Sequence, residues 1–516
     1  MKEEDTREVS FPRLLSGLWG HLNRRRQWQT VAVTLLMVGS AFAEVVSLGT
    51  VLPFIAVLVE PERAMSFGPI ASIADWVGIT SADDLLLPLA GVFVVVALAA
   101  ASLRLLVLWA TNRWAVATGA ELASKAFERT LYQPYEVHVR RHSSEVTSGV
   151  IQKVESVVYG LLIPLQTFVG AALTLLSVTV ALLMIDSQIA IVGLLVVCGS
   201  YSVTTLVVRG RLLRNGRQIA TGQVRVLKII QDSIGGIREV LVNRHQEVFL
   251  EEFRDSDGRL RRAQASNTVI QMSPRLMMEG IAMVLIVLLV LIVETRDGGL
   301  IGHLPEIAAF VVAGQRMFPA SQQCYGAAGI ITAFRPSLSE ALTILDQPIS
   351  QVEKFEVRDP FPFTSVLGCS GLSFRYADNE PWVLNDIDLQ ISKGSTVGLA
   401  GETGSGKSTL LDLMMGLLHP SIGSFTVDGV PLEGAVIGAW RQSIAHVPQD
   451  VFLVDSSIAE NIAFGVPKDL IDFERVRGSA QLAQIDNFII SEPEGYETFV
   501  GERGVRLSGG QKQRIG

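Results

Sequence analysis

The sequence predicts two unlike parts: an all-α membrane domain of six transmembrane helices with long cytoplasmic extensions, followed by an α/β domain built around a phosphate-binding loop. Three observations support this prediction. Hydrophobic residues make up 49% of the chain and charged residues 18%, with a mean hydropathy of +0.38, which is too apolar for an ordinary soluble protein. Apolar runs follow one another from residue 27 to about 335. From about 360 onward, short strand-like and helix-like segments alternate with glycine turns.

Six segments are predicted to cross the membrane, because a bilayer core takes about 20 apolar residues per helix. They cover residues 27–59, 85–110, 156–185, 187–208, 276–294 and 304–331. The sixth is the most polar, since it contains Glu306, Arg316 and Pro319. The first is longer than the apolar part of a cleavable signal peptide and lacks a small-residue cleavage site. We therefore expect it to remain as a membrane helix.

Lysine and arginine placement predicts the orientation, because basic loops stay on the cytoplasmic side. Three arginines at 24–26 precede the first span, and residues 60–84 carry five acids against one arginine. Residues 209–275 carry thirteen basic and seven acidic side chains. The sequence thus predicts a multi-pass protein of the plasma (inner) membrane with both termini in the cytoplasm. The inside connections 111–155 and 209–275 are longer than loops need to be, so we expect the membrane helices to continue into them as stalks.

The predicted division is a membrane domain at 1–335, a linker at 336–360 and a soluble domain at 361–516. The net charge of −8 argues against nucleic acid as a partner. Three cysteines, Cys198, Cys324 and Cys369, lie far apart and outside any Cys-x-x-Cys pattern, so neither disulfides nor a structural zinc site are expected.

A phosphate-binding loop follows an expected strand at 395–400 and precedes an expected helix at 410–418. The pattern G-x-x-x-x-G-K-[ST] is carried by Gly401, Glu402, Thr403, Gly404, Ser405, Gly406, Lys407, Ser408 and Thr409. Its glycines let successive backbone N–H groups face one anion, and the helix N-terminus adds partial positive charge. Lys407 is expected to reach the β- and γ-phosphates and the Ser408 hydroxyl to bind Mg²⁺. The predicted cofactors are therefore ATP and Mg²⁺.

A second motif lies near the end of the chain, where Leu507, Ser508, Gly509, Gly510 and Gln511 spell LSGGQ. Together with the phosphate loop, it makes essentially the whole chain resemble an exporter-type ATP-binding cassette (ABC) half-transporter. Physically, LSGGQ is a second anion cradle at a helix start. The resemblance implies a homodimer in which this signature closes over the γ-phosphate held by the other copy. It also implies ATP-driven export or flipping by alternating access.

Further residues match the family one at a time. Tyr376 matches the aromatic residue that stacks on adenine, although a lone tyrosine after a strand is usually a packing residue. Gln449 matches the glutamine that contacts Mg²⁺ and the attacking water, so the resemblance places it with Lys407 in catalysis; a solvated turn is the alternative. Residues 501–504 match a segment that touches the intracellular loops, or form a charged surface turn. By the same analogy, turns near 134–145 and 236–247 are expected to dock on the nucleotide-binding domain.

The chain ends at Gly516, a few residues after the signature. In the family, the Walker B aspartate, the catalytic glutamate and the switch histidine follow this point. We therefore expect a C-terminally truncated copy that binds nucleotide weakly and hydrolyses little ATP, whereas the intact protein is expected to be an ATPase. A nonfunctional gene product or an incomplete sequence is the alternative.

The predicted spans contain ionisable residues that could contact a substrate, because charges within a membrane are costly and usually functional. Arg104, Arg275 and Arg316 are predicted to line a cationic cavity for an anionic headgroup such as a pyrophosphate. Alternatively, Glu44 and Glu279 pair with these arginines structurally, or Arg275 reaches the membrane interface.

Segments 42–58, 273–280 and 314–320 are similar to the bacterial lipid-linked oligosaccharide flippase branch. The expected partners are therefore a second copy of the chain, membrane lipid and a transported substrate such as an anionic glycolipid. A drug, lipid or peptide exporter, or a nucleotide-binding membrane regulator without a pumping cycle, remains an alternative.

Overall fold

The computed structural model describes residues 11–59, 86–140, 154–294, 304–349 and 359–516. The chain divides into two compact units, 1–350 and 351–516, which we describe separately. The acidic connection 60–84, residues 141–145 of one predicted docking turn and most of the linker after residue 349 lie outside the described residues.

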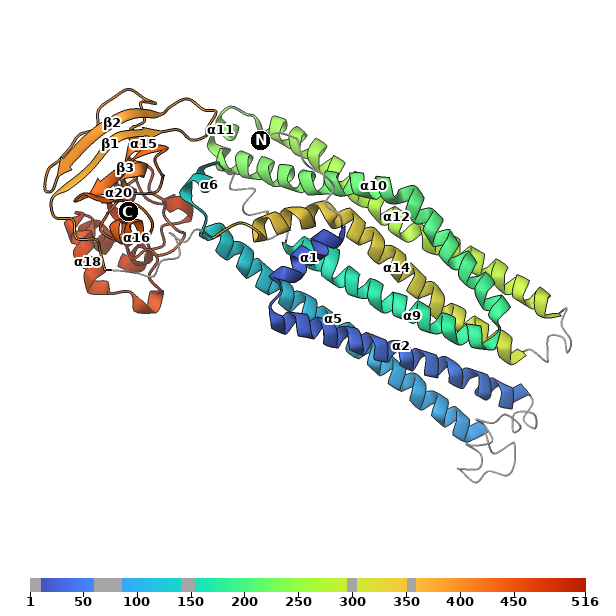
Figure 1. Cartoon of the computed structure of the whole chain (residues 1–516). Coiled ribbons are helices and arrows are strands. Elements are labelled where there is room, and N and C mark those ends of the chain that lie inside the picture. Colours follow the sequence, from blue (N-terminus) through green and yellow to red (C-terminus); the bar gives the residue numbers. More distant parts are fainter. Residues whose placement is uncertain (1–10, 60–85, 141–153, 295–303, 350–358) are drawn as a thin grey trace. The chain divides into compact units, whose positions relative to one another are not determined.

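The described part of the first unit consists of helices joined by short turns (Figure 1). Its elements are α1 (Phe11–His21), α2 (Arg24–Val59), α5 (Leu86–Leu131), α6 (Tyr135–Arg140), α8 (Val154–Val157), the π-helical turn η3 (Val158–Leu162), α9 (Ile163–Ile185), α10 (Ser187–Gly235), α11 (Ile237–Val242), α12 (Gln246–Glu294) and α14 (Leu304–Leu345). Helices α10 and α12 each contain 49 residues. At about 1.5 Å per residue, each is roughly twice as long as a bilayer core is thick. Both run without a break from their apolar segments into the basic residues 209–275, as expected for stalks.

Four helical segments among the described residues are long and apolar enough to span a membrane: Arg24–Val51, Leu86–Leu131, Val154–Ile185 and Gln246–Leu288. The other two predicted spans, 187–208 and 304–331, fall on α10 and α14. The count of six spans stays a prediction.

Long-range packing joins the helices of the first unit in a fixed order. Helix α9 lies between α2 and α14, while α10 and α12 run side by side (Figure 1). Helices α10 and α14 approach closely at Gly216, where a Cβ atom would collide with the Ala333 carbonyl oxygen. A buried hydrogen bond of 2.9 Å from Asn215 Nδ2 to Asn267 Oδ1 ties α10 to α12. The glycine allows close backbone contact, and the amide pair is satisfied within the helix interface.

The second unit contains an antiparallel sheet in the order β2-β1-β3-β4. Its strands are β1 (Val366–Phe374), β2 (Leu384–Ser392), β3 (Ile422–Val427) and β4 (Val430–Pro431). Leu367 of β1 lies opposite Ile391 of β2 and Val427 of β3. The helices are α15 (Lys407–Met414), α16 (Ala435–Arg441), α17 (Ile458–Ile462), α18 (Phe473–Leu482), α19 (Asp486–Ser491) and α20 (Gly509–Ile515). Three 3-10 turns complete the unit: η5 (Lys468–Leu470), η6 (Gly495–Glu497) and η7 (Glu502–Gly504).

Two local predictions differ from the structure. Residues 395–400, predicted as the strand before the phosphate loop, have no regular secondary structure. Their alternating apolar side chains Val397 and Leu399 remain 48% and 38% exposed, so neither packing nor a ladder partner among the described residues holds them as a strand. The residues predicted to begin the linker are also helical, because α14 continues to Leu345 with Leu338 and Leu342 buried.

Candidate functional site

The phosphate loop is shaped by two glycines in a left-handed conformation. Gly404 and Gly406 both have a φ of +86°, a backbone region that other residues rarely adopt. A Cβ at Gly406 would lie 2.8 Å from the Leu384 side chain and 3.1 Å from the Val383 carbonyl oxygen. Gly406 is also the N-cap of α15, so the loop leads directly into a helix N-terminus. This conformation and the following helix are what an anion cradle requires.

Lys407 is the first residue of α15, three residues earlier than the predicted helix start. Its ammonium donates to the carbonyl oxygens of Gly401 at 2.8 Å and Glu402 at 2.7 Å, and to Ser405 Oγ at 3.4 Å. The charge is thus held over the loop by backbone carbonyls. A phosphate entering the loop would meet this ammonium together with the backbone N–H groups.

Tyr376 lies beside the helix that follows the loop. Its hydroxyl is 3.2 Å from Thr409 Oγ1, and its ring meets Phe374 edge-on with centroids 5.0 Å apart. The side chain is half-buried. Tyr376 is therefore held next to the loop by a hydroxyl contact and a ring contact, and its side chain remains partly exposed.

Gln449 is exposed and makes no hydrogen bond to another described residue. It follows residues 444–448, which are irregular and leave Val447 66% exposed. The next segment is held by Asn461, whose side chain bonds to both backbone atoms of Val454, at 2.8 Å to N and 3.0 Å to O. Asn461 was not among the predicted site residues, and its place in the short helix α17 after the Ser457 cap is the one signal for it in the sequence.

An acidic residue that the sequence analysis did not select also lies on the helix after the phosphate loop. Burial raises the pKa of Asp412 in α15, and the nearby His446 partly offsets this shift. Asp412 of α15 thus lies near the segment before Gln449.

The signature motif forms the start of α20. Ser508 is the N-cap: its hydroxyl accepts from Gln511 N at 3.3 Å, and Gln511 Oε1 accepts from Ser508 N at 2.7 Å. This capping box satisfies two backbone donors of the helix start. Gly509 and Gly510 are exposed, and a Cβ on either would meet nothing within 4 Å. The structure therefore gives Gln511 a capping role and leaves the two glycines open to an approaching group.

The turn before the signature is conformationally demanding. Gly501, Arg503 and Gly504 all have positive φ values, of 74°, 52° and 66°. A Cβ at Gly504 would lie 2.7 Å from Leu453 Cδ1, and Lys512 of α20 donates to the Arg503 carbonyl at 2.9 Å. The turn is thus fixed against α20, and whether it touches the intracellular loops stays a prediction.

In the first unit, Glu44, Arg104 and Arg316 meet from α2, α5 and α14, and we call them the Glu44 cluster. Glu44 Oε1 is 3.0 Å from Arg316 Nε and 3.6 Å from Arg104 Nη1. The Glu44 side chain is only 5% exposed, whereas those of Arg104 and Arg316 are 43% and 31% exposed. Glu44 Oε2 is buried and has no hydrogen-bond partner. The cluster has two guanidiniums for one carboxylate and thus a net positive charge.

Arg275 makes a different contact from the other two predicted arginines. Its Nε lies 3.1 Å from Glu279 Oε1, one turn along α12, and both side chains are 62% exposed. The structure therefore brings Arg104 and Arg316 together around Glu44 and pairs Arg275 within its own helix. Glu44 and Glu279 are thus the ion-pair partners of these arginines, as in the alternative that the pairs are structural.

Two family models match the chain. One, described as the ABC transporter transmembrane region, matches residues 46–296, and the other, described as ABC transporter, matches residues 384–516. The chain belongs to the ABC transporter family. It is a half-transporter, since one polypeptide carries both the membrane region and the nucleotide-binding domain. The ABC resemblance and the two-part fold predicted from the sequence are thereby confirmed, as is a multi-pass membrane protein with an ATP-binding domain.

Several ABC transporters are similar over much of the chain. YgaD of Bacillus subtilis strain 168, named as a candidate multidrug export ATP-binding/permease protein, is 27% identical over 77% of this chain and 68% of its own length. An ATP-dependent lipid A-core flippase of Alkalilimnicola ehrlichii is 31% identical over 60% of this chain. The matched part spans about half, 51%, of that flippase.

A solved structure shares the fold of this ABC transporter. The structure of a bacterial Atm1-family ABC exporter with ATP bound aligns with a TM-score of 0.74 and covers 95% of this chain and 82% of that one. Sequence identity to it is 21%, so the likeness concerns the fold. The fold is thus that of an ABC exporter.

Proposed function

We propose that this half-transporter pairs with a second copy and uses ATP to export or flip an anionic amphiphile across the inner membrane, with both termini in the cytoplasm. The observation that carries the proposal is the presence of two helix starts suited to anions on one chain. The phosphate loop ends at the N-terminus of α15, and the signature caps α20 at Ser508. Two copies could enclose two nucleotides between loop and signature, because each motif supplies one side of a site.

In this proposal, backbone N–H groups of the loop and the Lys407 ammonium bind the β- and γ-phosphates. Tyr376 stacks on the adenine. The exposed glycines of the signature, Gly509 and Gly510, allow the partner copy's nucleotide to approach the α20 N-terminus. ATP binding then favours the closed pair, and the long helices α10 and α12 carry the movement to the membrane part.

Two side chains fit Mg²⁺. Ser408 and Gln449 are both exposed and offer side-chain oxygen atoms, and Mg²⁺ takes oxygen ligands while keeping several waters. When bound, the ion neutralises phosphate charge during phosphoryl transfer. Ser408 would hold it from the helix start, and Gln449 would orient the attacking water.

The proposed substrate class rests on the Glu44 cluster. Two guanidiniums around one buried carboxylate leave net positive charge within the membrane part, where an uncompensated charge is costly. A phosphate or pyrophosphate headgroup would balance it, and the guanidinium fork suits such oxygens. The likeness to lipid A-core flippases supports a lipid substrate. A drug exporter is the second candidate, favoured by the likeness to YgaD.

The test uses protein expressed from the complete gene and reconstituted in liposomes. We expect a polyprenyl pyrophosphate lipid to stimulate ATP hydrolysis, and Arg104→Gln or Arg316→Gln to reduce this stimulation while basal hydrolysis persists. Arg275→Gln, in an exposed pair, is the matched control and should retain stimulation. Equal stimulation of all three variants would remove the anionic headgroup from the proposal, and stimulation only by uncharged or cationic drugs would favour the second candidate.

A further inference from the structure

A groove between α10 and α12 is lined by four arginines and shares no residue with the Glu44 cluster or the phosphate loop. Its volume is about 370 Å³, within the range of small-molecule sites. The sequence analysis selected none of its residues for binding. The lining residues are Arg211, Arg214, Asn215 and Gln218 of α10 and Arg259, Arg262, Ala263 and Ser266 of α12.

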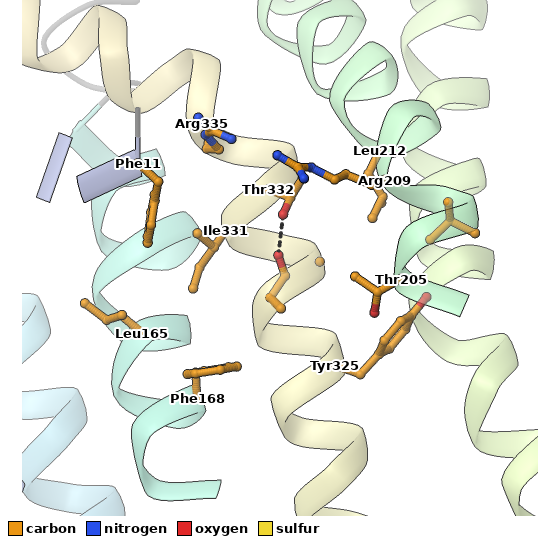
Figure 2. Close-up of a pocket in the computed structure, with 13 residues that line it drawn as sticks. Phe11, Leu165, Phe168, Thr205, Arg209, Leu212, Tyr325, Ile331, Thr332 and Arg335 are labelled. Atoms are coloured by element: carbon orange, nitrogen blue, oxygen red, sulfur yellow. Dashed lines mark hydrogen bonds between the residues drawn. The ribbon is translucent and has the colours of Figure 1, made fainter. Parts of the chain in front are cut away.

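The period of the two helices brings these side chains together. In each helix the lining positions follow the spacing i, i+3, i+4 and i+7, which places them on one face. A different face of α10 carries Thr205, Arg209 and Leu212, which line a separate cavity together with residues of α9 and α14 (Figure 2). Helix α10 thus turns one face to α14 and its arginine-bearing face at 211–218 to α12.

The floor of the groove is closed by the helix interface. Asn215 and Ala263 are only 5% and 4% exposed, and the Asn215 side chain is held by its 2.9 Å hydrogen bond to Asn267. The four arginines and Gln218 are exposed and form the walls. The groove therefore has a fixed base with charged side chains on both sides.

The charges of this groove are not balanced by nearby acids. Arg259 pairs with Asp255 at 2.6 Å. Neither helix has an aspartate or glutamate beside the other arginines, since residues 209–231 and 258–278 contain none. Three guanidiniums have no hydrogen-bond or ion-pair partner within the described part of the chain: Arg211, Arg214 and Arg262. An anion in the groove would offset the repulsion between these like charges.

We propose that the groove binds a group of two or more linked phosphates, with its oxygens between Arg211 and Arg214 on one helix and Arg262 on the other. A monophosphate carries about two charges and would leave one guanidinium unbalanced, whereas a di- or triphosphate can balance all three. The guanidinium fork suits phosphate oxygens. The volume favours a compact anion over an acidic protein segment.

The lining also limits what else the ligand can contribute. None of the lining residues is aromatic, so nothing in the groove stacks on a nucleobase. Ala263 is the one aliphatic side chain among them, so an acyl chain would gain little from burial there. Recognition therefore depends on the phosphates themselves.

A lipid headgroup and a soluble polyphosphate both offer this chemistry. Arg211 lies three residues after the predicted span 187–208, about 5 Å along the helix. In the proposed orientation, the groove thus begins where headgroups of the cytoplasmic leaflet lie and continues toward the cytoplasm. Of the proposed function, only this orientation bears on the source of the ligand.

The test measures the dissociation constant of inorganic tripolyphosphate by calorimetry on the complete protein in detergent. Every sample carries Lys407→Ala, so that the phosphate loop is weakened equally as a competing site. Arg211→Gln, Arg214→Gln or Arg262→Gln should each raise the dissociation constant about 3- to 10-fold, because each removes a charge-assisted contact. The double variant Arg211→Gln/Arg262→Gln should raise it more than about 10-fold.

Arg261→Gln is the matched control, since it removes the same charge from the residue next to Arg262. Arg261 pairs with Asp257 at 3.2 Å and does not line the groove, so the dissociation constant should change less than about 2-fold. Ser266→Phe fills the groove while all four arginines remain, and it should also weaken tripolyphosphate binding. A thermal unfolding curve for each variant separates lost binding from lost folding.

Three results would each overturn the proposal. They are equal losses of affinity in the Arg261 and Arg262 variants, unchanged affinity in the double variant, and equal affinity of the groove for orthophosphate and tripolyphosphate. Any of them would mean that the stalk attracts anions only through its overall charge.

The two sources are distinguished in phosphatidylcholine nanodiscs that contain a small fraction of a polyprenyl pyrophosphate lipid. Displacement of tripolyphosphate by this lipid would support the groove and assign it to a membrane lipid. Tripolyphosphate binding that the lipid leaves unchanged would support the groove with a soluble polyphosphate as its ligand. Arg316→Gln, in the Glu44 cluster, should alter neither result, so a failure of the proposed transport function is distinguishable from a failure of this site.

Discussion

The phosphate loop and the Glu44 cluster both present positive groups, yet they are built in opposite ways. The loop uses nine consecutive residues, with its shape set by two glycines at φ +86°. The Glu44 cluster uses side chains from α2, α5 and α14, which long-range packing brings within 3.0 and 3.6 Å of one carboxylate oxygen. A backbone cradle is thus encoded locally, whereas a side-chain cluster depends on the whole helical unit. Substitutions in the two regions should therefore fail in different ways.

The largest effect is expected at Lys407, whose ammonium is held over the loop. Lys407→Ala should lower ATP hydrolysis by the complete protein by about 10²-fold or more, because the ammonium stabilises charge that develops on the transferred phosphate. Lys393→Ala removes a lysine from an exposed turn after β2 and is the control. Steady-state hydrolysis and the thermal unfolding midpoint would be measured together. Similar losses of ATP hydrolysis in both lysine variants would mean that Lys407 contributes only to the overall positive charge of the domain.

The second effect concerns backbone shape, and two glycines provide a matched pair. Gly406→Ala forces a side chain into a left-handed conformation, which costs about 1–2 kcal/mol, and into contact with Leu384 and the Val383 carbonyl. We expect ATP affinity to fall about 10-fold or more. Gly509→Ala meets open space in α20 and should leave stability unchanged or raised by roughly 0.5–1 kcal/mol.

The Gly509 variant also tests the proposed partner contact. If an ATP held by the second copy approaches this glycine, Gly509→Ala should lower ATP hydrolysis. ATP binding to the phosphate loop should persist. Equal ATP affinity in the Gly406 and Gly509 variants would contradict a loop shaped by left-handed glycines.

The third effect is a loss of stability in the helical unit. Glu44→Gln leaves Arg104 and Arg316 without their shared carboxylate, and we expect the unfolding free energy to fall by about 1–3 kcal/mol, moderated by the exposure of both arginines. Glu279→Gln disrupts an exposed pair within one helix and should cost less than about 0.5 kcal/mol. Thermal unfolding in detergent compares the two. Equal decreases in the unfolding temperature of the two variants would show that the buried ion pairs of Glu44 contribute no more stability than the exposed pair of Glu279.

These differences explain what could be predicted from the sequence. The phosphate loop and the signature could be recognised in the sequence because each lies within a few consecutive residues. Ser508 caps a helix, as its position at an expected helix start suggested. The arginines were recognised as unusual, but their partners depend on how α2, α5 and α14 pack. The strand at 395–400 was predicted from a short apolar segment before the phosphate loop, and a strand also needs a neighbour to pair with.

The smallest effect tests the backbone cradle on a carboxylate of the protein itself. Asp428, in the turn between β3 and β4, accepts backbone N–H groups of Thr364 at 2.6 Å, Ser365 at 2.7 Å and Val366 at 2.7 Å. These bonds, that from Thr364 foremost, lower its pKa to about 2. Since an unfolded aspartate titrates near ~3.9, the stabilisation is present above about pH 4 and is lost as the pH falls toward 2.

Asp428→Asn separates charge from shape in this turn. Asp428 has a φ of 51°, and asparagine tolerates that conformation well. The wild type should therefore unfold at a higher temperature than the variant at pH 6, and the difference should shrink between pH 4 and about pH 2. Unfolding of the β-sheet unit would be followed by circular dichroism across this range. If the difference in unfolding temperature stays constant with pH, the N–H groups bind the side chain as a neutral acceptor and not because of its charge. The analogy between this turn and the phosphate loop would then fail.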